Sequence, residues 1–213
     1  EPATDFVGTI SVLDQSLAEK HLSLYFKDPK LQGIIGTSLT SGNSLGVVEA
    51  NLGTNKANYF LDRNFNLRIS LDKDGNLSQN LKITYQNRSP NDIWPGGIYK
   101  CICRIFVPLG SKLNLFKFGD EDLTSQVLVA TDNDRTVYEI LLNLNPGEIK
   151  TASLDYTLPQ KQKIVGGQVQ YVLNWIKQPG TGSDLLTIKL PIDQTINGNL
   201  TKDQKIEAEI GLN

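Results

Sequence analysis

The chain has 213 residues, of which 39% are hydrophobic and 21% are charged, and its formal net charge is −2. A disordered chain would carry more charge and fewer large apolar residues, so this composition indicates a globular protein. Binding along a nucleic-acid backbone needs clustered Lys and Arg on a basic surface, and a sequence pI of 5.5 argues against such a partner. No apolar run approaches the roughly 18 residues that a membrane span requires.

The chain contains no methionine and starts with Glu1. We therefore expect a processed chain or an excised fragment. A targeting or anchoring segment of the parent protein would then lie upstream of these residues.

Residues 1–58 predict a small α/β segment, the remnant of a larger domain. An apolar stripe predicts a helix over 12–20, and alternation predicts a strand over 21–26. Asp28-Pro29 predicts the start of a second helix, because Asp caps the first amides and Pro fits the first helical position. Val47-Val48 opens another strand. This alternation of helix and strand is typical of the closing elements of an α/β layer.

Residues 59–213 predict a mainly β fold, an antiparallel β-sandwich that is Ig-like or related. Apolar residues at 65–71 and 77–85 alternate with polar ones, and Asp74-Gly75 stands at the centre of the hairpin connection between them. Many short strands separated by Gly, Pro and Asn turns are typical of a sandwich. The other predicted strands span residues 99–107, 112–118, 126–130, 137–144, 150–158, 168–176, 185–190 and 205–212.

Both cysteines, Cys101 and Cys103, lie on one predicted strand. At period two they share a face with Tyr99, Ile105 and Val107, which predicts that they point into a core. A disulfide between residues two apart on a strand demands strained geometry, so we expect two free, buried thiols. Two cysteines and a single histidine cannot supply a four-ligand zinc set without carboxylates, so we expect no metal site.

Several runs are specific enough to suggest a relationship. They are residues 17–28, 47–59, 81–87, 107–111 and 145–148, and the most specific are Asn51 to Asn58 and Lys177 to Thr181. Together they resemble the C-terminal part of the bacterial domain-of-unknown-function family 4012.

This resemblance implies a parent protein that is anchored in a bacterial membrane, with the present residues outside the cell. The family offers no established catalytic residues to carry over. The Gly-Gly-Phe segment typical of its N-terminal half has no counterpart here. The resemblance therefore implies an excised C-terminal portion.

The two tryptophans receive different predictions. Trp175 shares a strand face with Tyr171 and Leu173, which predicts a core position. Trp94 precedes Pro95 and two glycines in a loop at one end of the predicted sandwich. Such loops carry contact residues, so Trp94 is the candidate binding residue. Packing of the ring over the mouth of the sandwich is the favoured interpretation of its position, ahead of a contact role.

Two acidic turns are weak candidates for cation binding. Asp72 and Asp74 are spaced like the start of a calcium loop, but Ile83 stands where that loop needs an acidic residue, so a hairpin turn is favoured. Asp132 and Asp134 predict a polar turn first and oxygen ligands second. The sequence has no Gly-x-Ser-x-Gly elbow and no phosphate-binding loop, and the lone His21 fits a surface or capping role.

The sequence thus favours a non-catalytic structural or recognition module of a bacterial envelope protein, located outside the cytoplasm, with no cofactor and with an envelope protein or a glycan as its partner. One alternative is an envelope hydrolase or transferase that uses carboxylates such as Asp132 and Asp134. Another is a carbohydrate-binding β-sandwich. Paired carboxylates with a raised pKa in a cleft would favour the enzyme, whereas an aromatic-bearing loop end would favour binding.

Overall fold

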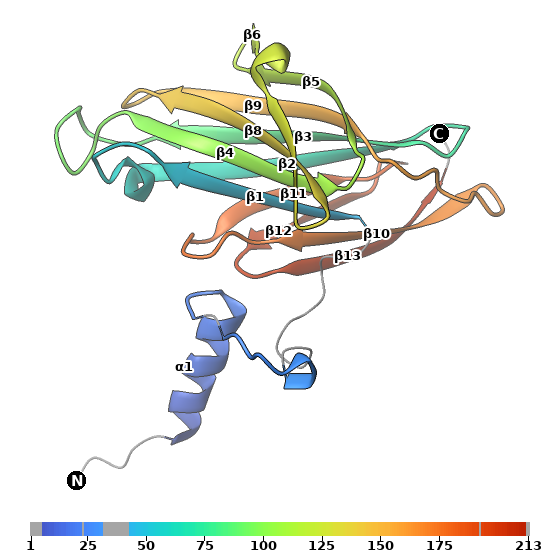
Figure 1. Ribbon diagram of the computed structural model, residues 1–213, viewed down its shortest axis with the longest axis horizontal. Helices are drawn as coiled ribbons and strands as arrows, with labels where there is room; N and C mark the ends of the chain where they lie inside the picture. The colour runs from blue at the N-terminus through green and yellow to red at the C-terminus, as the bar shows by residue number, and fades with distance from the viewer. Residues whose placement is uncertain (1–5, 23, 32–42, 192, 212–213) are drawn as a thin grey trace.

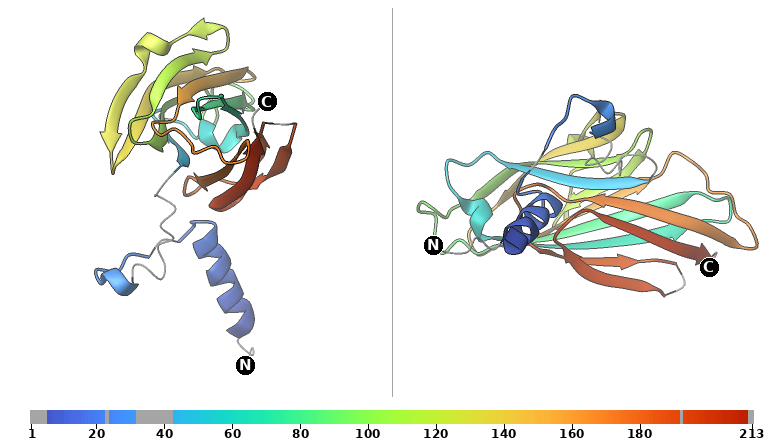
Figure 2. Two further views of the ribbon diagram at one scale, coloured as in Figure 1. Left: turned by 90° about the vertical axis from the view of Figure 1, so that its right-hand side faces the viewer. Right: turned by 90° about the horizontal axis from the view of Figure 1, so that it is seen from below.

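Two β-sheets pack face to face in the computed structural model, which describes residues 6–22, 24–31, 43–191 and 193–211 (Figure 1). The mainly β sandwich predicted from the sequence is confirmed. The sheets are mixed rather than wholly antiparallel, because each contains one parallel pair of strands. A helix, α1 (Phe6–Ala18), lies outside the sandwich (Figure 2).

The first sheet has six strands in the order β13-β10-β1-β4-β8-β7. Its parallel pair is β1 with β10, where Leu45 lies opposite Trp175. The strands are β1 (Ser44–Asn51), β4 (Tyr99–Pro108), β7 (Leu128–Asp132), β8 (Arg135–Leu144), β10 (Gln168–Ile176) and β13 (Gln204–Gly211).

The second sheet has seven strands in the order β12-β11-β2-β3-β9-β5-β6. Its parallel pair is β11 with β2. The strands are β2 (Leu61–Leu71), β3 (Leu77–Asn87), β5 (Lys112–Phe118), β6 (Glu121–Asp122), β9 (Ile149–Thr157), β11 (Asp184–Lys189) and β12 (Thr195–Leu200). Two short 3-10 helices complete the described elements, η1 (Ala57–Phe60) and η2 (Thr124–Gln126).

Strict alternation along the strands places the apolar side chains between the two sheets. Trp175 is fully buried and packs edge-on against Phe65, with ring centroids 5.5 Å apart, which confirms its predicted core position. Cys101 and Cys103 are free and fully buried, as predicted. The sandwich is therefore held by one continuous core with the thiols inside it.

The β2–β3 hairpin shows why Asp72 and Gly75 stand at their positions. The Asp72 carboxylate accepts hydrogen bonds from the Asp74 amide at 2.9 Å and from the Asn76 amide at 2.8 Å. Gly75 has φ of +83°, and a Cβ there would clash with the carbonyl oxygen of Gln162. The Asp72 carboxylate is thus occupied by hydrogen bonds within the turn. This arrangement agrees with the predicted hairpin turn rather than with a cation site.

The N-terminal elements differ from those predicted. The helix α1 begins earlier than the predicted 12–20 and ends at Ala18. Residues 21–22 and 24–26 form no strand, so that prediction is wrong. Leu22, Leu24 and Phe26 alternate, but their side chains remain exposed because the described residues offer this segment no strand to pair with.

The second predicted helix begins as expected. Pro29 to Leu31 are helical, and the Asp28 carboxylate accepts hydrogen bonds from the amides of Lys30 at 2.7 Å and Leu31 at 3.3 Å. The rest of the predicted helix lies outside the described residues.

The strand β1 belongs to the sandwich and not to a separate N-terminal segment. It pairs with β4 on one side and with β10 on the other, and Val47 is 3% exposed. The boundary predicted at residue 58 thus cuts through the six-stranded sheet. The local pattern at 47–48 showed a strand but not its distant partners, and we place the start of the sandwich at residues 43–44.

Candidate functional site

A cleft of about 850 Å³ opens at the end of the sandwich where β1 ends and β4 begins. Its walls come from β1, η1, β2, β3 and the connection between β10 and β11. The rim is polar and carries one highly exposed aromatic residue, Tyr59, which is 84% exposed. Other residues that line the cleft include Glu49, Asp62, Arg63, Arg88, Tyr99, Gln178, Thr181 and Asp184.

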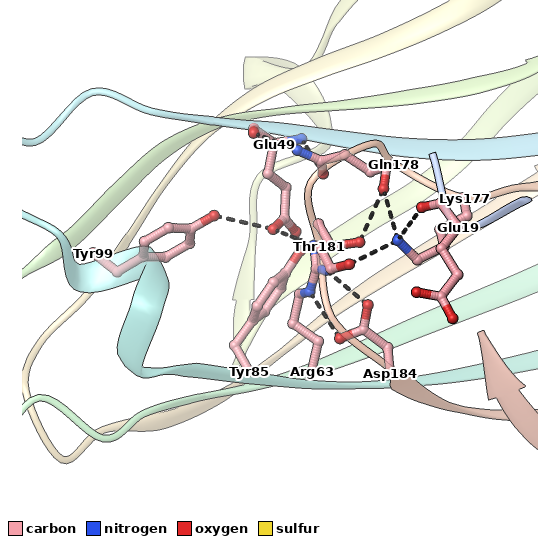
Figure 3. A network of polar contacts seen from close by, with 9 residues as sticks. All are labelled: Glu19, Glu49, Arg63, Tyr85, Tyr99, Lys177, Gln178, Thr181 and Asp184. Atoms are coloured by element: carbon pink, nitrogen blue, oxygen red, sulfur yellow. Dashed lines mark hydrogen bonds and ion pairs between the residues drawn. The ribbon is translucent and has the colours of Figure 1, made fainter. Parts of the chain in front are cut away.

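Three charged side chains from three strands meet at the floor of this cleft, as Figure 3 shows. The Arg63 guanidinium donates to Glu49 Oε2 through Nη1 at 2.9 Å and to Asp184 Oδ2 through Nη2 at 2.7 Å. Arg63 and Glu49 stand on opposite sheets, so the ion pairs join the two layers. Burial alone would lower the pKa of Arg63, but the charges of Glu49 and Asp184 outweigh it and raise that pKa.

Two tyrosines complete the hydrogen bonding of Glu49. The hydroxyl of Tyr85 donates to Glu49 Oε1, and the hydroxyl of Tyr99 donates to Oε2 at 3.0 Å. Burial, reinforced by the nearby charge of Glu49, raises the pKa of both phenols. Both tyrosines therefore stay protonated and remain donors.

The carboxylates of this cluster are paired but already occupied. The side chains of Glu49 and Asp184 are 3% and 10% exposed, and every carboxylate oxygen accepts at least one hydrogen bond from Arg63 or a tyrosine. Burial raises the pKa of Asp184, and the charge of Arg63 opposes that shift. A general acid or base needs a carboxylate oxygen within reach of substrate, so the cluster is suited to joining the sheets rather than to catalysis.

Lys177 lies beside the cluster in a cradle of backbone carbonyls. It is 1% exposed, and its ammonium donates to the carbonyls of Thr181 at 2.7 Å, Gln178 at 3.3 Å and Glu19 at 3.4 Å. Burial lowers its pKa. The contact with Glu19 ties the residues after α1 to the sandwich, and the ion pair of Lys20 with Asp203 at 2.7 Å adds a second tie.

Trp94 is exposed, which contradicts packing over the sandwich mouth. Its side chain is 69% exposed and that of its neighbour Ile93 is 70% exposed. Both lie in the loop between β3 and β4, at the same end of the molecule as the cleft. Exposure meets the requirement for a contact residue, while binding by Trp94 stays a prediction.

The backbone of this loop is held at several points. The amide of Lys56 donates to the Pro95 carbonyl at 2.8 Å, and Asn55 Nδ2 donates to the Ile98 carbonyl at 3.0 Å. The buried Asn87 donates from Nδ2 to the carbonyl of Gly97 at 2.9 Å. Ile93 and Trp94 therefore stand on a loop with a fixed backbone. The asparagine side chains supply hydrogen bonds that neighbouring strands would supply in a sheet.

The acidic turns that the sequence singled out do not assemble a site. Asp132 accepts hydrogen bonds from Arg104 Nη2 at 3.2 Å and from Asn133 Nδ2 at 2.9 Å. Asp134 is exposed at the same turn. No group of three or more potential metal ligands occurs within the residues that the structure describes. The imidazole of His21 contacts Glu19 Oε2 at 3.2 Å in an exposed position.

The buried cluster was missed by the sequence analysis, although one signal pointed to it. Glu49 follows Val47 at period two, and Arg63 precedes Phe65 at period two, so both charges occupy core-facing positions. An inward-facing charge on a strand is costly unless it is paired. The sequence pattern therefore indicated a buried ion pair, but it did not show which residues form it.

No protein-family model matches the chain, and no curated protein matches it either. The resemblance seen in the sequence is thus untested. Within the described residues, none of the helices has the length and apolar character to cross a bilayer.

Some solved structures match the chain at low similarity. A putative nutrient binding protein from Legionella pneumophila is 12% identical, with a TM-score of 0.45 over 80% of this chain and 67% of that chain. An M1 zinc metallopeptidase from Deinococcus radiodurans is 12% identical, with a TM-score of 0.31 over 70% of this chain and 38% of the peptidase. The chain thus spans well under half of the peptidase. Likeness at this level does not bear on function.

Proposed function

We propose that this chain is a non-catalytic recognition module of a bacterial envelope protein, located outside the cytoplasm, and that it binds a partner protein through the loop end that carries Trp94. The observation that carries the proposal is the exposure of Ile93 and Trp94, at 70% and 69%, on a loop whose backbone is anchored by hydrogen bonds.

An anchored loop favours binding because less conformational entropy is lost when the partner docks. Tryptophan is among the residues that most often dominate the energy of protein interfaces. The neighbouring loop adds Leu52, which is 48% exposed, and Ile98 beside it is 39% exposed. Exposed aliphatic and aromatic side chains at one end of a molecule are typical of the apolar centre of a protein interface.

A glycan platform is less well supported. It would require several aromatic rings lying flat in one plane, and the exposed Tyr59 instead stands edge-on to Phe60, with an interplanar angle of 86°. The hydrolase or transferase alternative is weakened because Asp132 is bound to Arg104 and Asn133, and because the carboxylates of Glu49 and Asp184 are engaged with Arg63.

The test compares Trp94→Ala with the control Val165→Ala. Val165 is 65% exposed and lies in the connection before β10, at the other end of the sandwich. Proteins captured from bacterial envelope extracts by the wild-type chain are purified and their affinity for each variant is measured. We expect Trp94→Ala to weaken binding at least tenfold with an unchanged melting temperature, and Val165→Ala to bind as the wild type does.

Equal binding by Trp94→Ala and the wild type would overturn the assignment of the loop. Capture of oligosaccharides instead of protein, lost on Trp94→Ala, would replace the protein partner by a glycan. A melting temperature that falls steeply in Trp94→Ala would place the ring in the core and remove the support for recognition.

A further inference from the structure

A second cavity, of about 450 Å³, lies at the opposite end of the sandwich from Trp94. It opens where β1 begins and β4 ends, beside the turn between β7 and β8 and the chain that follows β9. Its lining residues include Asn43, Ser44, Pro108, Leu109, Arg135, Leu158 and Pro159.

Arg135 lines this cavity without a counterion. The residue is 6% exposed, and its Nη2 is buried with no hydrogen-bond partner. Among the described residues, no carboxylate forms an ion pair with it. Asp132, its cross-strand neighbour, is bound to Arg104 at 3.2 Å, and the adjacent Asp134 is exposed at the rim. Burial lowers the pKa of Arg135, and no neighbouring charge opposes that shift.

Unpaired buried charges are rare because desolvation of an ion costs several kcal/mol. Arg63 is a buried arginine with a structural role, and its guanidinium forms ion pairs with two carboxylates. Arg135 is equally buried but has no carboxylate partner among the described residues. An arginine in that state is expected where a ligand supplies the negative charge.

A second unpartnered group lines the same cavity. Ser44 Oγ is buried without a hydrogen-bond partner within the described part of the chain. A guanidinium and a hydroxyl can both donate hydrogen bonds, so the two groups together suit an anionic oxygen acceptor.

The remaining walls are apolar. Pro108 and Leu109 approach from the end of β4, and Leu158 and Pro159 follow β9. A volume of about 450 Å³ falls within the range of small-molecule sites, which combine apolar walls with a few convergent polar groups. A free phosphate would leave these walls uncovered, whereas a carboxylate on a hydrocarbon body would cover them.

We propose that this cavity binds a small organic carboxylate, whose oxygens accept hydrogen bonds from Arg135 and Ser44 and whose apolar body packs against Pro108, Leu109, Leu158 and Pro159. The inference goes beyond the recognition function proposed for the Trp94 loop and rests on separate residues.

The first experiment uses three probes at matched ionic strength: hexanoate, hexan-1-ol and inorganic phosphate. Binding is followed by the melting temperature and by amide NMR shifts of the full chain. We expect hexanoate to raise the melting temperature in a concentration-dependent manner and to shift amides near Arg135. Hexan-1-ol lacks the charge and phosphate lacks the hydrocarbon body, so both should bind at least tenfold more weakly. No response to hexanoate, or a stronger response to phosphate or hexan-1-ol, would overturn the proposal.

The second experiment tests the residues. Arg135→Met keeps the length of the side chain and removes its charge, so it should abolish hexanoate binding while leaving the melting temperature of the free chain equal or higher. Arg68→Met, at an exposed position of β2, is the matched control and should bind normally. Ser44→Ala should weaken binding several-fold, and it serves as the test if Arg135→Met does not fold. Unchanged binding by the folded Arg135 or Ser44 variant would contradict the assignment.

Discussion

Arg63 carries more of the internal electrostatics than any other side chain described above, because one guanidinium compensates two buried carboxylates from two different sheets. The hydrophobic equivalent of such a cluster can be as stable as the charged one, but removal of one partner leaves a charge buried alone. The cluster therefore need not make the folded state more stable than an apolar core would, but the folded state depends on Arg63 once the two carboxylates are buried.

We expect Arg63→Met to lower the free energy of unfolding by about 3–5 kcal/mol at neutral pH, because Glu49 and Asp184 would stay buried without their cation. Burial already raises the pKa of Asp184 in the wild type, and loss of Arg63 would raise it further. A carboxyl whose folded-state pKa is raised stabilises the folded state while it is protonated, and that contribution is lost as pH rises through the raised pKa.

The destabilisation of Arg63→Met should therefore shrink as pH falls through the raised pKa of Asp184. Urea unfolding measured across the acid range would show it. Arg88→Met is the control, since the ion pair of Arg88 with Asp62 is exposed and should contribute less than about 1 kcal/mol without this recovery at low pH. A loss in Arg63→Met that stays constant with pH would contradict the argument.

The two thiols should be inert in the native chain. Burial raises the pKa of Cys101 to about 12 and raises the pKa of Cys103 as well, so the thiolate that reacts with alkylating agents is scarce at pH 8. We expect iodoacetamide to modify neither residue in the native state and both in denaturant, as read by mass spectrometry. Native labelling as fast as denatured labelling would show that the strand face is open.

At the scale of single elements, Gly75 in the β2–β3 hairpin has a matched counterpart in Gly180, which lies in the connection between β10 and β11. Gly75 and Gly180 both have positive φ, at +83° and +74°, but only Gly75 has a backbone atom where a Cβ would be, while nothing lies within 4 Å at Gly180. Gly180→Ala should cost about 1–2 kcal/mol from backbone strain alone. Gly75→Ala should cost roughly a further 1–3 kcal/mol because the segment at Gln162 must move. Equal losses in chemical unfolding would refute the role of this close approach.

Strands with clear alternation and turn residues at their ends were predicted well, however distant their partners are in sequence. The strands at 112–118 and 168–176 match β5 and β10 residue for residue, because alternation and turn chemistry are local properties. The edge strand β12 was missed, since Thr195–Leu200 is polar, contains Gly198 and has little alternation. The segment at 21–26 was wrongly predicted as a strand, because it has the alternation but finds no strand to pair with among the residues that the structure describes.

The sites were predicted less well than the strands. Trp94 is exposed, although its packing over the sandwich mouth was the favoured interpretation, and Asp132 and Asp134 form the polar turn that the sequence favoured over a set of oxygen ligands. The cavity beside Arg135 combines the start of β1 with the ends of β4 and β9. No sequence spacing shows that these chain segments meet, because the meeting depends on which strands become neighbours.

At the scale of the whole molecule, the position of β1 decides where the folding unit begins. We expect a chain of residues 43–213 to unfold cooperatively with a melting temperature close to that of the full chain. The reason is that α1 lies outside the sandwich and leaves Val12 65% exposed and Leu13 50% exposed.

A chain of residues 59–213 should instead fail to fold. Without β1, strands β4 and β10 lose the neighbour between them, and Trp175 and Tyr99 lose part of their cover. Circular dichroism and thermal unfolding of the two chains, expressed side by side, make the comparison. A soluble, cooperatively folded 59–213 would restore a domain boundary near residue 58.

The parallel pairing of β1 with β10 also affects how the protein is made. About 120 residues separate the end of β1 at Asn51 from the start of β10 at Gln168. At 5–20 residues per second, a ribosome needs roughly 6–24 s to add them. During that interval the edge of β1 at Ser44, Leu45 and Gly46, which pairs with Asn174, Trp175 and Ile176, has no native strand to bond with and is open to pairing with other nascent chains. We therefore expect newly synthesised chains to need bound chaperones, or ribosomes spaced widely along the messenger RNA, until Ile176 has emerged from the ribosome.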